Sequence, residues 1–382
     1  MNLEQFTAGV YTQQYQYRSF VPSRLNMEWT WSDPSVNTLL ANANLKLGEL
    51  NAFSSHIPDI DIFIRMHVAK EATTSSRIEG TRTELGDVIM KKQNVDSEKR
   101  DDWQEVQNYI KAMNYAIRRL AKVPISTRLL KETHKILMAG VRGKGKLPGE
   151  YRKSQNWIGG ATIQDAVFIP PHHHEVPALM GDLENFLHNK QIQLPDLVRI
   201  AMAHYQFETI HPFLDGNGRL GRLLITLYLV SNNILSKPTL YLSAYFEKHK
   251  SLYFDNLVRV RTSNDFLQWI KFFLVAVAET SKEGIATFKA ILALREDCEG
   301  RRLRKLGRKL PRAHQLLTCL YRTPTVTATQ VGTLLDVSPA TANSLLTDFV
   351  RLGILQEMTG GKRNRIFTFR EYLGLFAQSE RV

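Results

Sequence analysis

Cysteine is nearly absent from this chain of 382 residues, which contains only Cys298 and Cys319. These two thiols match no disulfide or zinc-site spacing, so we expect both to be buried or idle. Long apolar runs are missing as well: the most apolar window, "FLQWIKFFLVAVA" (266–278), is too short to cross a bilayer and contains Lys271. The N-terminus lacks the apolar stretch of a secretory signal. These absences predict a cytoplasmic protein with no membrane partner.

Repeats of fixed period and low-complexity tracts are also lacking. Hydrophobic residues make up 43% of the chain and charged residues 23%, as in ordinary globular proteins, and the length suits two or three domains. The net charge of +13 is uneven, because residues 300–382 hold 14 Lys/Arg against 5 Asp/Glu, a net +9. This asymmetry predicts a separate C-terminal module with a basic surface.

Helical periodicity begins near Asn37 and dominates the chain. The texture changes over 147–171, where turn residues separate short β-type runs, and we expect a hairpin with "NWIGG" and "AVFIP" as its arms. The expected helices cover residues 60–80, 102–122, 126–140, 175–189, 195–209, 219–233 and 264–294.

The tail follows a different pattern. A short helix over 327–338 precedes a second over 338–353, which has a Ser N-cap, a Pro in its first turn and a Gly stop. Two strands then flank a Gly-Gly turn within 354–369. Helix, turn, helix and hairpin are typical of a winged helix, so the fold class is mainly α with a C-terminal winged helix-turn-helix domain.

The segment "HPFLDGNGRLGR" (211–222) is too polar for a core, yet it lies between two apolar helices. Gly216 and Gly218 allow a sharp turn that points amide groups into one concavity at the start of the next helix. Arg219 and Arg222 lie three residues apart and therefore share a face of that helix. Bare amides, a helix N-terminus and two guanidiniums predict a polyphosphate site.

Two further residues of this segment bear on chemistry. Asp215 would repel phosphate unless a divalent cation bridges them, and Mg²⁺ accepts one carboxylate together with phosphate oxygens. His211 precedes the turn, and histidine is the usual proton acceptor near neutral pH. A corner between helices with solvated charges is the plainer alternative, but it does not explain five distinct chemical features in twelve residues.

The segment closely resembles the signature HPFx(D/E)GNGRxxR of Fic proteins at every defined position. The resemblance extends over about 60–280: "LPGEYRKSQNWIGG" is similar to the target-positioning flap of the family, and 251–274 to its helices after the signature. It implies a Fic-type helical bundle with a β-hairpin flap, and transfer of AMP from ATP to a protein hydroxyl. The implied chemistry is an in-line attack on phosphorus that needs positioning, charge neutralisation and one base.

The resemblance also implies a role for each matching residue. His211 would deprotonate the target hydroxyl, and Asp215 would hold Mg²⁺. The implied nucleotide contacts come from the loop (Gly216, Asn217 and Gly218, as an anion hole), from the helix that follows (Arg219, Leu220, Gly221 and Arg222, with the arginines on the β- and γ-phosphates) and from the region beyond it (Lys248 and Tyr253, beside base and ribose).

A second motif, "SSRIEG" (75–80), closes the helix expected over 60–80. Ser75 and Glu79 lie four residues apart and share a face. The motif resembles the family's inhibitory pattern (S/T)xxxE(G/N), in which the glutamate pairs with the second arginine of the signature, here Arg222. The resemblance implies inhibition within one chain, because Glu79 would compete with the γ-phosphate. A plain helix end with a solvated glutamate is the alternative.

Other signals are weaker. "HHH" (172–174) could indicate a metal, although an exposed loop is the preferred interpretation, and His134 and His204 are expected to be packed or hydrogen-bonded. The winged helix could bind DNA through 338–350 and the wing, but the expected recognition helix is poor in Arg and Lys and contains Asp348, so protein docking is an equal alternative. The wing residues concerned are Lys362, Arg363 and Arg365.

These observations divide the chain into an N-terminal helical region (1–122), a Fic core (123–280), a helical and basic linker (281–310) and a winged-helix domain (311–382). The preferred function is an autoinhibited protein adenylyltransferase that uses ATP and Mg²⁺ and modifies a Ser, Thr or Tyr hydroxyl of a target protein and of itself. The alternatives are a nucleotide-sensing, DNA-binding transcription regulator and a transferase that removes AMP or moves another nucleotidyl or phosphoryl group. A homodimer, the target protein and a DNA site stay open.

Overall fold

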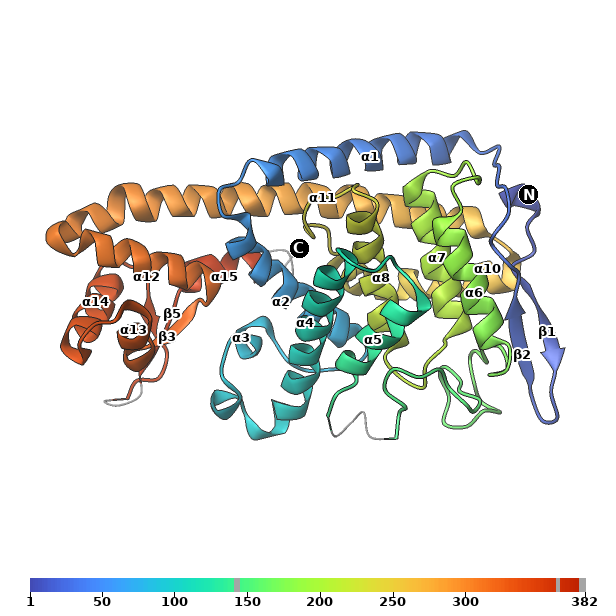
Figure 1. Cartoon of the computed structure of the whole chain (residues 1–382), viewed down its shortest axis with the longest axis horizontal. Helices are drawn as coiled ribbons and strands as arrows, with labels where there is room; N and C mark the ends of the chain where they lie inside the picture. The colour runs from blue at the N-terminus through green and yellow to red at the C-terminus, as the bar shows by residue number, and fades with distance from the viewer. Residues whose placement is uncertain (141–144, 362–364, 378–382) are drawn as a thin grey trace.

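The computed structural model describes residues 1–140, 145–361 and 365–377, and helices dominate it (Figure 1). The helical body is followed by a smaller C-terminal unit at one end of the molecule. The helices are α1 (Pro34–Ser55), α2 (Ile60–Ile78), α3 (Leu85–Val88), α4 (Arg100–Leu120), α5 (Thr127–Leu137), α6 (Val176–His188), α7 (Asp196–Ile210), α8 (Asn217–Ser231), α9 (Ser243–Lys248), α10 (Lys250–Ser263), α11 (Phe266–Asp297), α12 (Leu310–Arg322), α13 (Ala328–Leu335), α14 (Pro339–Arg351) and α15 (Arg370–Ala377).

Two long helices, α1 and α11, run side by side along the molecule (Figure 1). α11 has 32 residues and continues without a break through the boundary predicted at residue 280. Strong helix formers such as Ala, Leu, Glu and Lys fill its second half, which explains this continuity. Gly284 allows α1 to approach, because a Cβ there would lie 3.2 Å from Leu50 Cδ1. None of the described helices has the length and apolar character that a membrane span requires.

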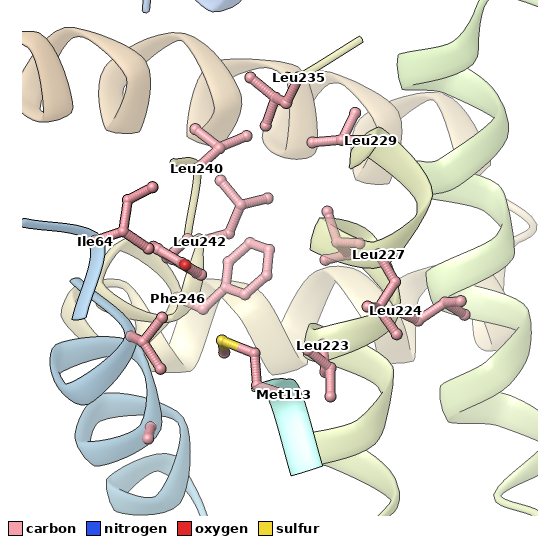
Figure 2. Close-up of a cluster of buried hydrophobic side chains, with 14 of the residues drawn as sticks. Ile64, Met113, Leu223, Leu224, Leu227, Leu229, Leu235, Leu240, Leu242 and Phe246 are labelled. Atoms are coloured by element: carbon pink, nitrogen blue, oxygen red, sulfur yellow. The ribbon is translucent and has the colours of Figure 1, made fainter. Parts of the chain in front are cut away.

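The helices α7 and α8 form the centre of the body. Both are buried on nearly all sides, as expected of helices that are surrounded by other elements. Figure 2 shows how Leu223, Leu224 and Leu227 of α8 pack near Phe246 of α9 and Ile64 of α2. This packing fixes the ends of the loop that joins α7 to α8.

The expected flap hairpin is only partly formed. Its two arms pair at a single antiparallel bridge between Ile158 and Phe168, and neither arm is a strand. Gly159 and Gly160 have φ angles of 71° and 75°, which end the extended conformation directly after the bridge. Their close approach to the other arm requires glycine, since a Cβ on Gly160 would lie 2.4 Å from the Asp165 carbonyl oxygen.

A hairpin that the sequence analysis did not predict lies at the N-terminus. β1 (Gly9–Gln13) pairs antiparallel with β2 (Arg18–Pro22). β2 reaches the flap, because the Phe20 N–H donates to the Ile169 carbonyl at 2.9 Å and the Phe20 ring lies 6.1 Å from that of Phe168. The N-terminal hairpin therefore supports the flap from outside.

The C-terminal unit contains α12 to α15 and a three-stranded sheet of order β3-β5-β4. β3 (Thr325–Thr327) and α12 were not predicted, whereas α13, α14, β4 (Gln356–Glu357) and β5 (Ile366–Thr368) fall within the expected segments. The order of elements suits a winged helix, and that assignment stays a prediction. Lys362 and Arg363 lie outside the described residues, and Arg365 is paired with Glu357 at 3.4 Å.

The helix α2 lies between the body and the C-terminal unit (Figure 1). Near its start, the Phe63 ring meets that of Tyr321 edge to face at 5.4 Å. One turn later, the His67 ring lies 5.0 Å from that of Phe376. The other end of α2 carries Glu79 into the loop between α7 and α8, so one helix touches both parts of the molecule.

Candidate active site

The loop between α7 and α8 begins and ends with left-handed backbone. His211 ends α7 with φ 49° and Gly216 precedes α8 with φ 78°. The Asn217 side chain closes the loop, because its Oδ1 accepts from the Phe213 N–H at 2.9 Å and its Nδ2 donates to the Phe213 carbonyl at 2.8 Å. The side-chain amide of Asn217 is thus occupied within the loop, and only the backbone N–H of this residue is available to an anion.

The His211 imidazole is oriented as a base. Its Nδ1 lies 3.3 Å from the Glu208 carbonyl oxygen and therefore carries the proton, which leaves Nε2 as the acceptor. Burial lowers the pKa of His211 to about 4, so the ring is neutral at pH 7. The buried Arg152 fixes the backbone here, donating from Nε to the His211 carbonyl at 3.0 Å and from Nη2 to the Pro171 carbonyl.

Asp215 presents a carboxylate to solvent beside this base. Its side chain is 44% exposed, and Oδ1 accepts from the Gly216 N–H at 2.6 Å. His134 holds its backbone: the Gly149 N–H donates to Nδ1 at 2.9 Å, so Nε2–H donates to the Asp215 carbonyl at 2.9 Å. The His134 ring is thus hydrogen-bonded as expected. An accessible carboxylate on a fixed backbone fits one oxygen ligand of a hard cation such as Mg²⁺.

Arg222 is 2% exposed in its side chain and is held by the end of α2. Its Nε donates to the Ser75 Oγ at 2.9 Å, and its Nη2 donates to the Ser75 carbonyl at 2.8 Å and to the Glu79 Oε1 at 2.7 Å. The structure therefore brings together the three residues that the resemblance linked.

Glu79 also covers the start of α8. A Cβ on Gly218 would lie 2.2 Å from the Glu79 Oε1, so the carboxylate lies against the turn whose amides face an anion. Burial is the largest single influence and opposes ionisation, but the charge and hydrogen bond of Arg222 together with the charge of Arg219 outweigh it and hold the pKa of Glu79 below its usual value. An ionised carboxylate therefore lies against the turn that the sequence predicts to bind a phosphate.

Arg219 has a carboxylate partner that the sequence analysis missed. Its Nη1 donates to the Glu105 Oε2 of α4 at 2.8 Å, and its Nη2 lies 3.5 Å from the Asp215 Oδ1. Glu105 is 114 residues away in sequence, and no local pattern reveals such a pair. A cavity of about 350 Å³ adjoins this pair and is lined by Lys92, Lys111, Asp215 and Arg219 among others.

Two predicted residues of α8 face away from the loop. Leu220 is fully buried in the core, so only its backbone can meet a nucleotide. Gly221 leaves room for Glu208, because a Cβ there would lie 2.2 Å from the Glu208 Oε1. Burial raises the pKa of Glu208 to about 8, so this carboxyl is largely protonated at pH 7.

Tyr253 and Lys248 are the remaining predicted nucleotide contacts. Tyr253 is 1% exposed, and its hydroxyl donates to the His204 Nε2 at 2.9 Å while the His204 Nδ1–H donates to the Gly221 carbonyl at 3.0 Å. The tyrosine thus supports α8 from behind, and His204 is hydrogen-bonded as expected. Lys248 is exposed at the end of α9. Contact of either residue with a nucleotide stays a prediction.

Together these groups form an anion site at a helix N-terminus with a neutral base and an accessible carboxylate beside it. This is the class of site that nucleotidyl or phosphoryl transfer requires. Residues 37–118 match the profile described as Fic/DOC family N-terminal, and residues 124–229 match that of the Fic/DOC family. The chain belongs to the Fic/DOC family over these two segments.

Curated relatives agree with this membership. "Protein adenylyltransferase Fic" of Culex quinquefasciatus is 30% identical over 62% of this chain and 42% of its own length. "Probable protein adenylyltransferase aq_aa38" of Aquifex aeolicus is 42% identical over 24% of this chain and 26% of its own length. This chain thus covers less than half of these relatives.

The fold similarity extends further along the chain. A Fic family protein from Desulfovibrio desulfuricans superposes with a TM-score of 0.56 at 21% identity, over 88% of this chain and 96% of its own. A segment of Fic-1 from C. elegans gives 0.51 at 20% identity, over 67% of this chain and 74% of its own. The mainly helical fold with a Fic-type body is thus confirmed.

Proposed function

We propose that the chain is a protein adenylyltransferase that moves AMP from ATP to a Ser, Thr or Tyr hydroxyl, and that Glu79 inhibits it. Its relatives carry the name of that activity, and the loop between α7 and α8 together with the first turns of α8 contains a base, a carboxylate and two guanidiniums. The observation that carries the proposal is the neutral His211, whose Nε2 is left as an acceptor by the Nδ1 contact.

The proposed reaction uses this nitrogen. His211 Nε2 takes the proton of the target hydroxyl, whose oxygen forms a bond to the α-phosphorus. The bond between that phosphorus and the bridging oxygen to the β-phosphate breaks, and pyrophosphate leaves. The amides at the start of α8 stabilise the charge on the α-phosphate, because they point at it with the positive end of the helix dipole.

The remaining groups hold the nucleotide. Arg219 and Arg222 bind the β- and γ-phosphates, and the buried positions of both guanidiniums strengthen these contacts. Asp215 supplies the carboxylate for Mg²⁺, which neutralises phosphate charge when bound. In these roles, Arg219, Arg222 and Asp215 must either leave the ion pairs that they form in this structure or keep them while they bind the phosphate or the cation.

Inhibition follows from the contacts of Glu79. The γ-phosphate and this carboxylate need the same Nη2 of Arg222, and both are anions. With Glu79 in place, the triphosphate cannot extend to Arg222, and its α-phosphorus is not in line with the attacking oxygen. The proposal therefore distinguishes an inhibited state, in which Glu79 is paired with Arg222, from an active state, in which the γ-phosphate binds Arg222.

Transfer of labelled phosphate from ATP tests the activity. The Glu79→Gly variant should label itself or a lysate protein from α-³²P-ATP and not from γ-³²P-ATP. Substitution His211→Ala in that background should reduce labelling by about 10²–10⁴-fold while ATP binding persists. Label from γ-³²P-ATP alone would indicate phosphoryl transfer, and ATP binding without label would indicate a nucleotide sensor, so either result would overturn the proposal.

Other expectations from the sequence remain predictions. They are the identity of the target, a cytoplasmic location, a homodimer, removal of AMP by the same site, and the binding of DNA or protein by the C-terminal unit.

A further inference from the structure

Three consecutive histidines form a cluster outside the proposed active site. One ring nitrogen from each of His172, His173 and His174 lies within 4.8 Å of the other two. Neighbouring ring centroids are 4.2 Å apart, and the outer two rings are 5.0 Å apart. Successive side chains of an extended segment alternate between faces. Here the turn before α6 brings three imidazoles to one side.

This turn is held by the surrounding backbone. The Glu175 N–H donates to the His172 carbonyl at 2.9 Å, which closes the turn at the start of α6. Pro170 and Pro171 precede the cluster, and the Gln155 Nε2 donates to the Pro170 carbonyl at 3.0 Å. The backbone of the cluster is therefore held in place by hydrogen bonds. This reduces the conformational entropy that is lost when three side chains are ordered around an ion.

One nitrogen of the cluster lacks a partner although it is buried. The Nδ1 of His173 is shielded from solvent and forms no hydrogen bond with the described residues. A buried polar atom without a partner is costly, and an ion is one of the few agents that satisfies it.

We propose that His172, His173 and His174 bind one divalent transition-metal ion such as Zn²⁺. Imidazole is the ligand that zinc, nickel and copper prefer, whereas magnesium prefers oxygen. A tetrahedral ion at roughly 2.1 Å from each nitrogen needs nitrogens about 3.4 Å apart. The side chains must close by about 1.4 Å at their widest pair, and their partial exposure leaves room for that rotation. Water completes the coordination.

The site is distinct from Asp215, yet it is joined to the catalytic loop through Arg152. That guanidinium donates both to the Pro171 carbonyl, next to His172, and to the His211 carbonyl. Metal binding to the cluster does not depend on the proposed transfer activity, and each can be tested without the other.

Isothermal titration of the chelator-treated full-length chain with ZnCl₂ tests the inference. We expect one Zn²⁺ per chain, no competition by excess Mg²⁺, and at least about tenfold weaker binding after His173→Gln. Co²⁺ in place of Zn²⁺ should give visible absorption bands that disappear in the triple variant His172→Gln, His173→Gln, His174→Gln. The control His56→Gln removes an exposed histidine at the end of α1 and should leave binding unchanged.

Two results would overturn the inference. One is the absence of stoichiometric Zn²⁺ binding by the folded wild-type chain. The other is binding that survives in the triple variant, which would place the ion elsewhere, for example at His211 and Asp215. Circular dichroism of each variant separates loss of ligands from loss of fold.

Discussion

At the scale of single residues, both guanidiniums in the first turns of α8 already have carboxylate partners. Arg222 is paired with Glu79 at 2.7 Å and Arg219 with Glu105 at 2.8 Å. The two carboxylates differ in position, since Glu79 covers the start of α8 whereas Glu105 approaches from α4. We therefore expect opposite effects when they are removed.

Substitution Glu105→Gln should weaken the binding of Mg²⁺ with nucleotide. Without its partner, Arg219 carries an uncompensated charge 3.5 Å from the Asp215 Oδ1 and competes with the cation for that oxygen. Loss of an outer partner of this kind typically costs roughly 10- to 100-fold in metal affinity. Titration of Mg²⁺ during binding of a fluorescent ATP analogue measures the effect. Glu132→Gln, an acid paired with Arg128 elsewhere, is the control, and equal Mg²⁺ dependence in both would refute the role of Glu105.

The pH dependence of transfer should reflect the burial of His211. Its pKa is lowered to about 4, so the ring stays neutral as pH falls through 6.5 and becomes protonated only near 4. In the Glu79→Gly variant, the rate of transfer should therefore stay constant as the pH is lowered from 7 to about 5. The unfolded chain binds more protons in this window, so folding stability declines with acid, and circular dichroism must be recorded in parallel. An acid limb near pH 6.5 in folded protein would show a solvent-exposed histidine.

At the scale of elements, α2 supports the carboxylate of Glu79, which we propose to be inhibitory. Glu79→Gly should raise turnover by about 10- to 100-fold, because the α-phosphorus gains in-line geometry. ATP affinity should change less, since the amides and Arg219 still hold the nucleotide. Steady-state kinetics separate the two effects. Ser75→Ala keeps the carboxylate and should activate less than Glu79→Gly, and an unchanged or lower rate in Glu79→Gly would refute inhibition.

Elements with strong local signals were predictable from the sequence, and those fixed by distant contacts were not. The loop between α7 and α8 was found because Gly216 and its neighbours combine several chemical requirements within twelve residues. The hairpin of β1 and β2 lacks a glycine turn, and its strands are polar on one side. The flap was expected to contain strands, but the positive φ angles of Gly159 and Gly160 interrupt them. Glu105 and Arg152 act through contacts 114 and 59 residues away, which no periodicity encodes.

At the scale of the whole molecule, the C-terminal unit packs on the same helix that ends at Glu79. We predict that Tyr321→Ala, which removes the ring against Phe63, destabilises the chain by ~3 kcal/mol and raises basal transfer. A looser α2 would hold its carboxylate less firmly on Arg222. Hydrogen exchange of α2 and the basal rate report the two effects.

The matched control is Tyr321→Phe, which keeps the ring and should behave as wild type. In the Glu79→Gly background, Tyr321→Ala should give no further gain, because the inhibitory contact is already absent. A gain that persists in this double variant would mean that the C-terminal unit acts by another route.

The uninterrupted α11 has a consequence for the choice of target. A helix of this length spans about 48 Å, and α1 packs along it past its midpoint to Gly284, so the C-terminal unit and the loop between α7 and α8 keep a fixed separation. Helix α11 therefore sets the distance between the C-terminal unit and His211. A target protein bound to the C-terminal unit would place near His211 only those hydroxyls that lie at this distance from its bound surface. The shape of the folded target, more than the residues around its hydroxyl, would then decide which side chain is modified.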